Sequence, residues 1–371
     1  MTITSLPGRS RKTRLASVSL LSLAVSLGPT ACALGGGSDG GDAENASGSS
    51  KKQVVLATHE SWAMSKEVLA KFRKETGYTL KVQSSGDAGA LTNKLVLTKG
   101  SPIADAAYGV DNTFASRAVD QGVFQDYEPP QEPASAQGLE MPDKADAAAL
   151  TPVDFGDVCV NVDDVWFEKH HVTPPKGLDD LTKPAYKNLF VTPGATTSSP
   201  GLAFLLATIA KYGEDGWQKY WGDLMANGTK ITSGWEDAYT VDFTAGGGNG
   251  DRPIVLSYDS SPPFTIPKGS DKPTTSALLD TCFRQVEYVG VLKGAANPEG
   301  AKALADFMLS KDFQEALPEN MYVFPADDSV KLPDLWAKWA EVPSEPLSLD
   351  PATIAQHRDA WLTTWGEITT R

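Results

Sequence analysis

The chain has 371 residues, of which 41% are hydrophobic and 22% charged. This length and composition are typical of a globular protein with about two domains. Its 33 Lys and Arg against 47 Asp and Glu give a formal net charge of −14 at pH 7. The acid excess argues against a nucleic-acid-binding surface, which needs a basic stripe, and mildly favours cationic ligands.

The N-terminal segment is typical of an export signal. Its basic residues end at Arg14, and the apolar run Leu15–Leu27 is too short to span a bilayer comfortably. Small residues then precede Cys32, in a pattern that resembles a lipobox except that Pro29 stands where a leucine is usual. We therefore expect residues 1–32 to be a lipoprotein signal peptide with Cys32 lipidated. Ordinary cleavage beside an incidental cysteine is the alternative.

A linker is expected next. The segment Gly35–Ser50 is rich in glycine and serine and nearly free of apolar residues. Such a composition predicts a flexible linker, which we place at residues 33–52. Together with the signal, it predicts an exported domain tethered to the outer face of the cell membrane.

Strand and helix patterns alternate in the next part of the chain. The predicted strands are Gln53–Thr58, Thr79–Gln83 and Ile103–Val110, and the predicted helices are Ser65–Gly77, Ala88–Thr98 and Phe114–Gly122. This alternation implies an α/β layer with a parallel sheet. Ligands collect at the carboxyl ends of such strands, a rule that selects His59, Glu60, Trp62, Asp111 and Asn112 as candidate binding residues.

Two longer strand patterns flank the middle third of the chain. Val153–Val162 contains Cys159, and Thr281–Val291 contains Cys282. In an exported protein this pair of cysteines predicts a disulfide, with two buried free thiols as the alternative. Strands in these positions would cross between two lobes, so we place the disulfide at the hinge.

A helix predicted at about Gly201–Tyr212 has a polar start. Ser199 is placed to be its N-cap and Pro200 its first residue. Free N–H groups at a helix start, with the hydroxyls of Ser198 and Ser199, form either a site for an anion or a hydroxyl group, or a simple cap.

The remaining segments are assigned from pattern alone. Glu128–Asp146 is predicted to be a loop, because it is rich in proline and acidic residues. The other expected elements are a strand at Leu189–Thr192 and helices at Trp217–Met225, Pro298–Ser310, Phe313–Leu317 and Pro351–Thr370. We expect Trp361 and Trp365 of the last helix to pack on a domain.

The stretch Ile231–Phe264 combines aromatic and acidic residues. Trp235 and Tyr239 flank two acids, and a short apolar strand leads to Tyr258. Aromatic faces beside carboxylates suit a flat, positively charged organic ligand, through stacking and cation–π attraction. The alternative is that the aromatic rings belong to the core and the acids to a solvated loop. Gly246–Gly250 lacks the lysine of a phosphate-binding loop and is predicted to be a surface turn.

Motifs for catalysis are missing from the chain. It contains no GxxxxGK[ST] or HExxH sequence and no Cys/His spacing typical of a metal site. We therefore expect neither an enzyme nor a cofactor nor a metal. A glycoside hydrolase with paired carboxylates stays open as a less favoured reading, because acidic residues are many.

The order of elements resembles the two-lobe extracellular solute-binding proteins of ABC importers. Leu178–Leu189 and Asn297–Leu317 resemble segments of the members that bind iron, polyamines and thiamine. A narrower resemblance, to the thiamine-binding members, rests on Gly109–Asn112, Ser198–Leu202, Gly234–Tyr239, Leu256–Pro262, Gln356–Trp361 and Trp365.

The resemblance implies an α/β periplasmic-binding-protein-like fold with hinge strands and a ligand cleft between two lobes. We place one lobe at 53–157 and 284–371, and the other at 158–283. The implied function is capture of thiamine or its phosphates, without chemistry, by a monomer that delivers the ligand to an ABC permease. The alternatives are a ferric-iron, polyamine or aminophosphonate carrier, although the adjacent tyrosines usual in iron carriers are absent from the sequence.

The same resemblance implies roles for individual residues. Trp235 and Tyr258 would stack on the rings of the ligand, while Tyr239 would line the pocket. Asp111 and Glu60 would meet the positive charge or the exocyclic amine. His59 stands where the subfamily usually has a tyrosine, so Trp62 could supply that wall instead. The rest of the expected set is polar and comprises Asn112, Ser198, Ser199, Gly201 and Ser260, with the two serines and the glycine at the helix start facing the hydroxyl or phosphate end.

Overall fold

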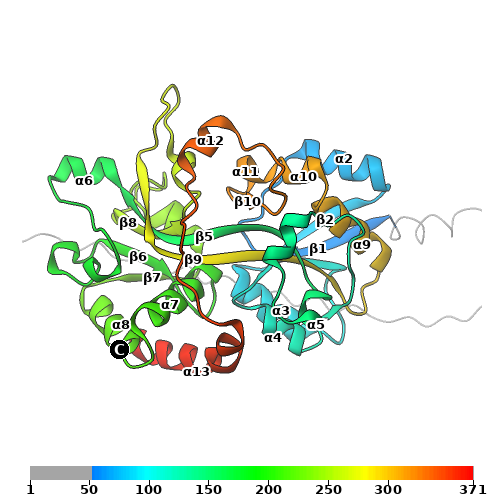
Figure 1. The fold of residues 1–371 in the computed structure, drawn as a ribbon, viewed down its shortest axis with the longest axis horizontal. Helices are drawn as coiled ribbons and strands as arrows, with labels where there is room; N and C mark the ends of the chain where they lie inside the picture. The colour runs from blue at the N-terminus through cyan, green and yellow to red at the C-terminus, as the bar shows by residue number, and fades with distance from the viewer. Residues whose placement is uncertain (1–51, 371) are drawn as a thin grey trace, which may run out of the picture. The chain divides into compact units, whose positions relative to one another are not determined.

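The computed structural model describes residues 52–370. Within them, ten strands form one mixed sheet in the order β2-β1-β3-β9-β5-β8-β6-β7, with β4 paired to β9 and β10 to β5 (Figure 1). The strands are β1 (Gln53–Thr58), β2 (Thr79–Ser84), β3 (Ala106–Asp111), β4 (Phe124–Gln125), β5 (Thr151–Asp163), β6 (Phe190–Pro193), β7 (Lys230–Thr232), β8 (Ile254–Tyr258), β9 (Thr275–Leu292) and β10 (Phe324–Pro325).

Helices cover the sheet, and the predicted ones are found except Phe313–Leu317, which spans the end of one short helix and the start of the next. The α-helices are α2 (Lys66–Thr76), α3 (Ala88–Thr98), α4 (Ala115–Asp120), α5 (Lys144–Ala147), α6 (Asp164–His170), α7 (Ser199–Tyr212), α8 (Trp217–Ala226), α9 (Pro298–Met308), α10 (Lys311–Gln314), α11 (Leu317–Asn320), α12 (Asp334–Trp339) and α13 (Pro351–Thr369). The short 3₁₀ turns are η1 (Ala134–Leu139), η2 (Leu178–Asp180), η3 (Pro184–Tyr186) and η5 (Pro262–Thr265), and η4 (Asp237–Asp242) is a π-helical turn. None of the helices in 52–370 has the length and apolar character needed to cross a membrane.

The sheet has a parallel part at each end and two long antiparallel strands between them. Strands β2, β1 and β3 are parallel at one end, and β8, β6 and β7 are parallel at the other. Between them β5 and β9 pair antiparallel over most of their lengths. The parallel sheet predicted from the alternating strands and helices after Gln53 is therefore confirmed for β2, β1 and β3. We refer to the two ends as the β1 half and the β6 half.

Two predicted segments need correction. Strand β9 begins at Thr275, six residues before the predicted start, because the apolar residues of Thr275–Asp280 are consecutive and give no alternation. Glu128–Asp146 is not a continuous loop, since η1 and α5 lie within it. In addition, α12 was not predicted; its Trp336 packs edge-on against Phe324 at 4.6 Å between ring centroids.

The C-terminal helix α13 contacts both halves of the fold. Trp365 meets Trp221 of α8 edge-on, with ring centroids 5.5 Å apart, and Trp361 is also buried, as expected. Nearer the start of α13, the Arg358 guanidinium donates to Ser116 Oγ on α4 at 3.4 Å. Figure 1 shows α13 (red) running beneath α8 towards α4. The division into lobes at 157/158 and 283/284 stays a prediction. In that division α13 belongs to the lobe 53–157 with 284–371, but it packs chiefly on α8 of the other lobe.

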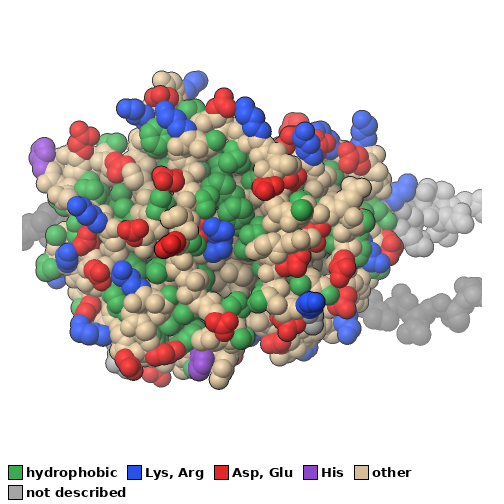
Figure 2. Space-filling model, in the orientation of Figure 1, with side chains coloured by type: hydrophobic (Ala, Val, Ile, Leu, Met, Phe, Trp, Pro, Cys, Tyr) green, Lys and Arg blue, Asp and Glu red, His purple; other side chains and the backbone are tan. Residues whose placement is uncertain are grey.

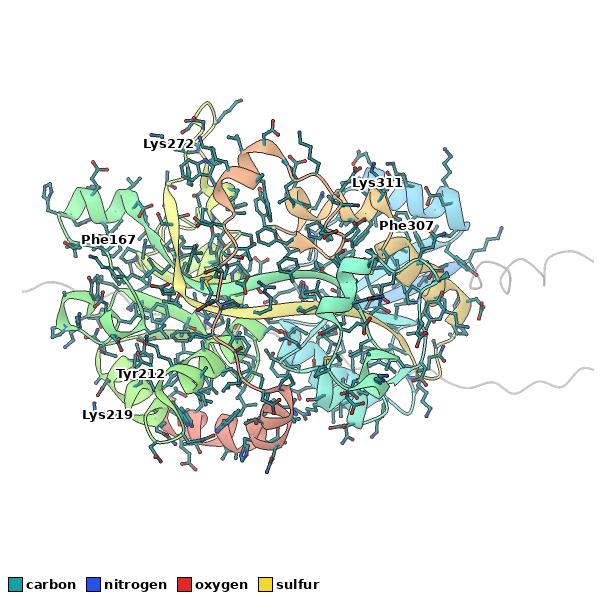
Figure 3. The ribbon with its side chains drawn as sticks, viewed as in Figure 1. Phe167, Tyr212, Lys219, Lys272, Phe307 and Lys311 are labelled. Carbon is teal, nitrogen blue, oxygen red and sulfur yellow. A yellow bond between two sulfur atoms is a disulfide. The ribbon has the colours of Figure 1, made fainter. Side chains whose placement is uncertain are left out.

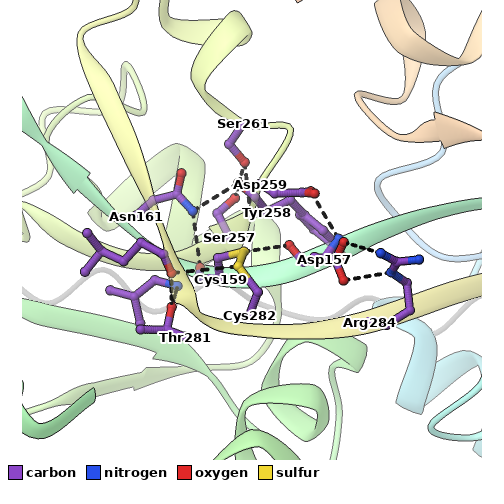
Figure 4. Close-up of a disulfide and its surroundings, with 12 residues drawn as sticks. Asp157, Cys159, Asn161, Ser257, Tyr258, Asp259, Ser261, Thr281, Cys282 and Arg284 are labelled. Carbon is purple, nitrogen blue, oxygen red and sulfur yellow. Dashed lines mark hydrogen bonds and ion pairs between the residues drawn. A yellow bond between two sulfur atoms is a disulfide. The ribbon is translucent and has the colours of Figure 1, made fainter. Parts of the chain in front are cut away.

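A disulfide joins the two long central strands. Cys159 of β5 and Cys282 of β9 are both fully buried, and their Cα atoms are 4.2 Å apart (Figure 4). The bond lies where the β5–β9 register shifts between Val158 and Val160, so it fastens the two strands at an irregular point of their ladder.

Removing this disulfide is expected to cost about 5 kcal/mol of folding stability, because the closed loop it restrains in the unfolded chain is long. The cysteines are 123 residues apart. The measurement is the free energy of unfolding in denaturant for the double variant Cys159→Ser/Cys282→Ser. The wild-type protein unfolded with reductant is the matched control and should lose a similar amount. Equal stability with and without reductant would contradict the expectation.

Acidic and basic side chains are interspersed on the visible surface. In Figure 2 the Lys and Arg side chains are scattered among Asp and Glu and do not form a stripe on this face. The predicted signal peptide, the lipidation at Cys32 and nearly all of the predicted linker lie outside the described residues.

Candidate ligand-binding site

A cavity of about 250 Å³ lies between the two halves of the fold. The β1 half contributes the segment after β1 and the start of α3, and the β6 half contributes η4, η5 and the start of α7. The aromatic residues that line it are Trp235, Tyr239, Tyr258, Phe264 and Tyr322. The polar residues that line it include His59, Asp87, Ser199, Glu236, Gln285 and Glu287.

Trp235 and Tyr239 form a rigid aromatic wall. They are four residues apart on a helical turn, so their side chains share one face, and their rings stack with centroids 4.9 Å apart and an interplanar angle of 16°. The Trp235 indole N–H donates to Ser257 Oγ at 3.0 Å, and this hydroxyl also bonds Ser261 Oγ at 2.7 Å. One face of the Trp235 ring is therefore covered by Tyr239, and the half-buried remainder is turned to the cavity.

Tyr258 is held by both central strands. Its hydroxyl donates to Gln285 Oε1 of β9 at 3.0 Å. On β5, a Cβ at Gly156 would lie 3.0 Å from the Tyr258 ring, so glycine gives the ring room to lie against the strand. Burial, and then the nearby Glu287 carboxylate, raise the pKa of Tyr258 well above its usual value. The phenol is therefore neutral and can donate.

His59 belongs to a buried charged network. Its Nε2 lies 3.1 Å from Glu287 Oε1, while the Tyr108 hydroxyl contacts Glu287 Oε2 at 2.9 Å and Asp154 Oδ2 at 2.5 Å. Gly109 has a positive φ, and a Cβ there would lie 2.1 Å from the His59 ring. Glycine at this position therefore allows the imidazole to fold back onto β3.

The pKa values of this network follow from burial and pairing. Burial alone would lower the pKa of His59, but the Glu287 carboxylate outweighs it and raises the pKa above 6.5. Burial would raise the pKa of Glu287, and His59 reverses this and lowers it. Burial, and then Glu287, raise the pKa of Asp154 well above its usual value. The network thus holds a His59–Glu287 ion pair beside Asp154, whose neutral form is favoured by its burial and by the Glu287 charge.

The ion pair predicts a pH-dependent part of folding stability. Because the pKa of His59 is raised in the folded state, the stabilisation is fully present below the unfolded value of about 6.5. It is lost as the pH rises through the folded pKa. We expect the stability difference between wild type and His59→Gln to be larger at pH 6 than at pH 9, measured by denaturant unfolding. A difference that grows towards pH 9 would contradict this sign.

Carboxylates from both halves meet at the mouth of the cavity. Asp87 caps α3 by accepting from Ala88 N at 2.6 Å through Oδ1, and its Oδ2 accepts from Trp235 N at 3.0 Å. Burial, and then Asp87, Glu236 and Asp237, raise the pKa of Glu60. Asp87 therefore ties the start of α3 to the aromatic wall and places a negative charge beside it.

A second contact between the halves closes the other side of the cavity. Ser260 Oγ donates to the Tyr322 carbonyl at 2.6 Å, and the Tyr322 ring meets Phe264 edge-on at 5.1 Å. Tyr322 has a φ of 56°, a conformation that costs a residue other than glycine free energy. This strained backbone at Tyr322 lies where the chain turns the Tyr322 ring into the cavity.

The predicted site residues divide into two groups. His59, Ser199, Trp235, Tyr239 and Tyr258 line the cavity. The residues of the expected set that do not line it are Glu60, Trp62, Asp111, Asn112, Ser198, Gly201 and Ser260.

The residues outside the cavity have other partners. Trp62 packs against Tyr108 and Phe313, with ring centroids 5.0 and 6.0 Å away. Asp111 Oδ1 accepts from Thr113 and Phe114 in a local turn. The Asn112 amide bonds the backbone of β9 at Arg284 and Val286. The Asp111 and Asn112 side chains therefore support the strands behind the cavity.

The start of α7 differs from the predicted arrangement. Ser198, and not Ser199, is the N-cap, since Ser198 Oγ accepts from Gly201 N at 3.4 Å. A Cβ at Gly201 would lie 2.5 Å from Gly194 O, so this glycine serves close packing of the helix against the preceding loop. Of the three, only Ser199 is among the residues that line the cavity.

Sequence reasoning missed several residues that line the cavity, among them Asp87, Phe264, Gln285, Glu287 and Tyr322. Asp87 had a usable signal, because it immediately precedes a predicted helix at Ala88 and is a favoured N-cap residue. Of the other four, Gln285 and Glu287 lie on β9, Phe264 lies in η5 and Tyr322 follows α11, so their approach depends on long-range pairing and loop packing.

Comparison with known proteins gives matches that agree with the expected family. The model of the bacterial extracellular solute-binding protein family matches residues 67–344. The thiamine-binding periplasmic protein of Brucella abortus is 29% identical over 86% of this chain and 93% of its own length. The thiamine-binding periplasmic protein of Escherichia coli is 26% identical over 86% and 94%.

Among solved structures, a periplasmic thiamin binding protein superposes with a TM-score of 0.74. It is 26% identical, and the match covers 86% of this chain and 96% of that one. The expected α/β periplasmic-binding-protein fold is therefore confirmed.

Proposed function

This chain belongs to the bacterial extracellular solute-binding protein family, and from that premise we propose that it captures thiamine between its two halves and delivers it to a membrane permease. It is the solute-binding component of an ABC importer, works outside the cytoplasm and catalyses no reaction. In our proposal the protein acts as a monomer, and the lobes 53–157 with 284–371 and 158–283 close about β5 and β9.

The observation that supports thiamine as the ligand is the aromatic wall of Trp235 and Tyr239 beside carboxylates. Thiamine is a cation with two flat aromatic rings joined by a methylene group, and the exposed face of Trp235, backed by Tyr239, offers a stacking surface for one ring. Asp87 and Glu236 line the same cavity and complement a positive charge. Tyr239 Oη is buried without a protein partner and can donate to the polar groups of a ligand.

Calorimetric titration of the purified protein with thiamine tests this proposal. We expect saturable binding of one thiamine per chain, with quenching of tryptophan fluorescence. Putrescine, aminoethylphosphonate and ferric citrate serve as the competing ligands. Mass spectrometry of the small molecules released by denaturation identifies what co-purifies. Absence of thiamine binding together with tight binding of a competitor would contradict the proposal.

The lipid anchor is a separate part of the proposal. If Cys32 is lipidated, the exported protein partitions into the detergent phase of Triton X-114 and incorporates labelled palmitate. The variant Cys32→Ser should lose both properties while its thiamine affinity is unchanged. Equal partitioning of the two proteins would count against the anchor.

A further inference from the structure

The C-terminal segment crosses the central strands without reaching the cavity. It comprises α12, the connection that follows and α13, and we refer to residues 334–370 as the C-terminal strap. Figure 1 shows the strap descending from α12 across β5 and β9 to α13, which lies beneath them. None of the strap residues lines the cavity. Any effect of the strap on binding must therefore act through the arrangement of the two halves.

The first helix of the strap joins β10 to the loop after η5. Trp336 of α12 is buried and packs edge-on against Phe324 of β10. Three residues later, the Trp339 indole N–H donates to the Asp271 carbonyl at 2.8 Å, and Lys338 Nζ lies 3.6 Å from the Asp271 carboxylate. Asp271 lies between η5 and β9, so α12 contacts the β6 half as well as β10.

The strap then fills a free edge of β9. Strand β9 pairs with β3 only from Glu287 onward, so the same edge has no strand neighbour at Cys282 and Phe283. There Leu347 N donates to the buried Cys282 carbonyl at 2.8 Å, and Leu347 forms an isolated bridge with Phe283. Because Cys282 is bonded to Cys159, the strap crosses the central strands beside the disulfide.

The last helix of the strap is fixed to the β6 half. Trp361 and Trp365 of α13 are both buried. The Trp365 ring meets Trp221 of α8 edge-on, and the Trp361 indole N–H lies 3.1 Å from each carboxylate oxygen of Glu214, just before α8. Two buried indoles remove a large apolar area from water, so we expect α13 to move together with α8.

The contact of α13 with the β1 half centres on a buried guanidinium. Arg358 is only 5% exposed, and it donates to Ser116 Oγ of α4, the helix that follows β3. Its ion pair with Asp359 is on the same helix, and that carboxylate is 83% exposed. At 3.4 Å the bond to Ser116 is long, so a small displacement of α4 breaks it. The contact with α4 is therefore weaker than the contact with α8.

The two halves touch at the cavity in this structure. Asp87 Oδ2 accepts from Trp235 N at 3.0 Å, and Ala90 N donates to the Thr197 carbonyl at 3.2 Å. Separation of the halves about β5 and β9 would break these contacts and move α4 relative to α8. A helix fixed on α8 cannot then keep Arg358 on α4. A contact made in only one arrangement shifts the equilibrium towards that arrangement by its free energy.

We propose that the C-terminal strap is a latch that favours the closed arrangement of the two halves, with the contact of Arg358 on α4 as the part that opens. The inference rests on the proposed closure about β5 and β9. A latch of this kind lowers the apparent Kd of a ligand that binds the closed protein, because more of the free protein is already closed. It also slows ligand release, because opening must first break the contact.

The distance between spin labels on the two halves tests the latch without any ligand. Lys219 of α8 and Lys311 of α10 are each 79% exposed, and Figure 3 shows them at opposite corners of the view. Labels at Lys219→Cys and Lys311→Cys, in the Cys32→Ser background, leave the buried disulfide intact. We expect Arg358→Met to raise the ratio of open to closed protein about tenfold, the scale of a hydrogen bond to a charged group.

Two further variants make the distance result specific. Arg73→Met removes an exposed arginine of α2 and is the matched control, which should leave the distances unchanged. Ser116→Ala removes the acceptor from the α4 side and should shift the ratio in the same direction by a smaller factor. Ser116→Ala also carries the test if unfolding curves show that Arg358→Met is poorly folded.

The rate of thiamine release is the second measurement. In stopped-flow experiments we expect Arg358→Met to release thiamine several-fold faster than Arg73→Met. Thiamine binding with both the distances and the release rate unchanged in Arg358→Met would overturn the latch and leave the proposed function standing. The expected shift in distances, in a protein that binds no thiamine, would support the latch and overturn the proposed ligand.

Discussion

Trp235→Ala is expected to weaken thiamine binding by more than about 2 kcal/mol, or roughly 30-fold in Kd. The indole is fixed by stacking on Tyr239 and by its hydrogen bond to Ser257 Oγ, so the ligand finds a preorganised ring. Alanine removes both the stacking surface and the cation–π attraction. Calorimetry is the measurement, because it does not depend on the tryptophan signal.

Two further variants make this result specific. Trp235→Phe keeps an aromatic face without the indole N–H and should lose an intermediate amount of affinity. Trp339→Ala removes an indole that donates to the Asp271 carbonyl, outside the cavity, and should bind thiamine normally. A Kd for Trp235→Ala within about threefold of wild type would remove Trp235 from the proposed site. Unfolding curves for each variant separate loss of binding from loss of folding.

Arg284→Met is expected to lower the free energy of unfolding by about 3–5 kcal/mol. The guanidinium donates to both carboxylate oxygens of Asp157, at 2.7 and 2.9 Å, and lies over the Phe155 ring. Asp157 is fully buried beside Asp259, whose pKa is raised well above its usual value by burial and then by Asp157. Without Arg284, a buried carboxylate has no counter-charge.

The controls for this variant separate charge from packing. Asp157→Asn in the Arg284→Met background should recover part of the loss, because it removes the uncompensated charge. Lys219→Met breaks an exposed ion pair with Asp223 and should change stability by less than about 1 kcal/mol. Denaturant unfolding is the measurement for all of these variants. If Arg284→Met were as stable as Lys219→Met, the buried ion pair would not stabilise the junction of β5 and β9.

Local sequence determined the type of most elements. Apolar periodicity was sufficient for helices such as α2 and α9, since each buries one face against the sheet. The two cysteines on long strand patterns were sufficient to predict the pairing that the structure contains. Trp235 and Tyr239 could also be selected locally, because a spacing of four residues places both rings on one face of a helical turn.

Only the tertiary structure decided which polar groups face the cavity. The strand-end rule selected both His59 and Asp111, but a rule about location says nothing of side-chain direction. Asp111 turns back to cap its own loop at Thr113, whereas Gly109 lets His59 fold towards Glu287. Glu287 itself reaches His59 only through the pairing of β9 with β3, between segments more than 170 residues apart. Asp87 likewise meets Trp235, and Phe264 meets Tyr322, because long-range strand register and loop packing bring their segments together.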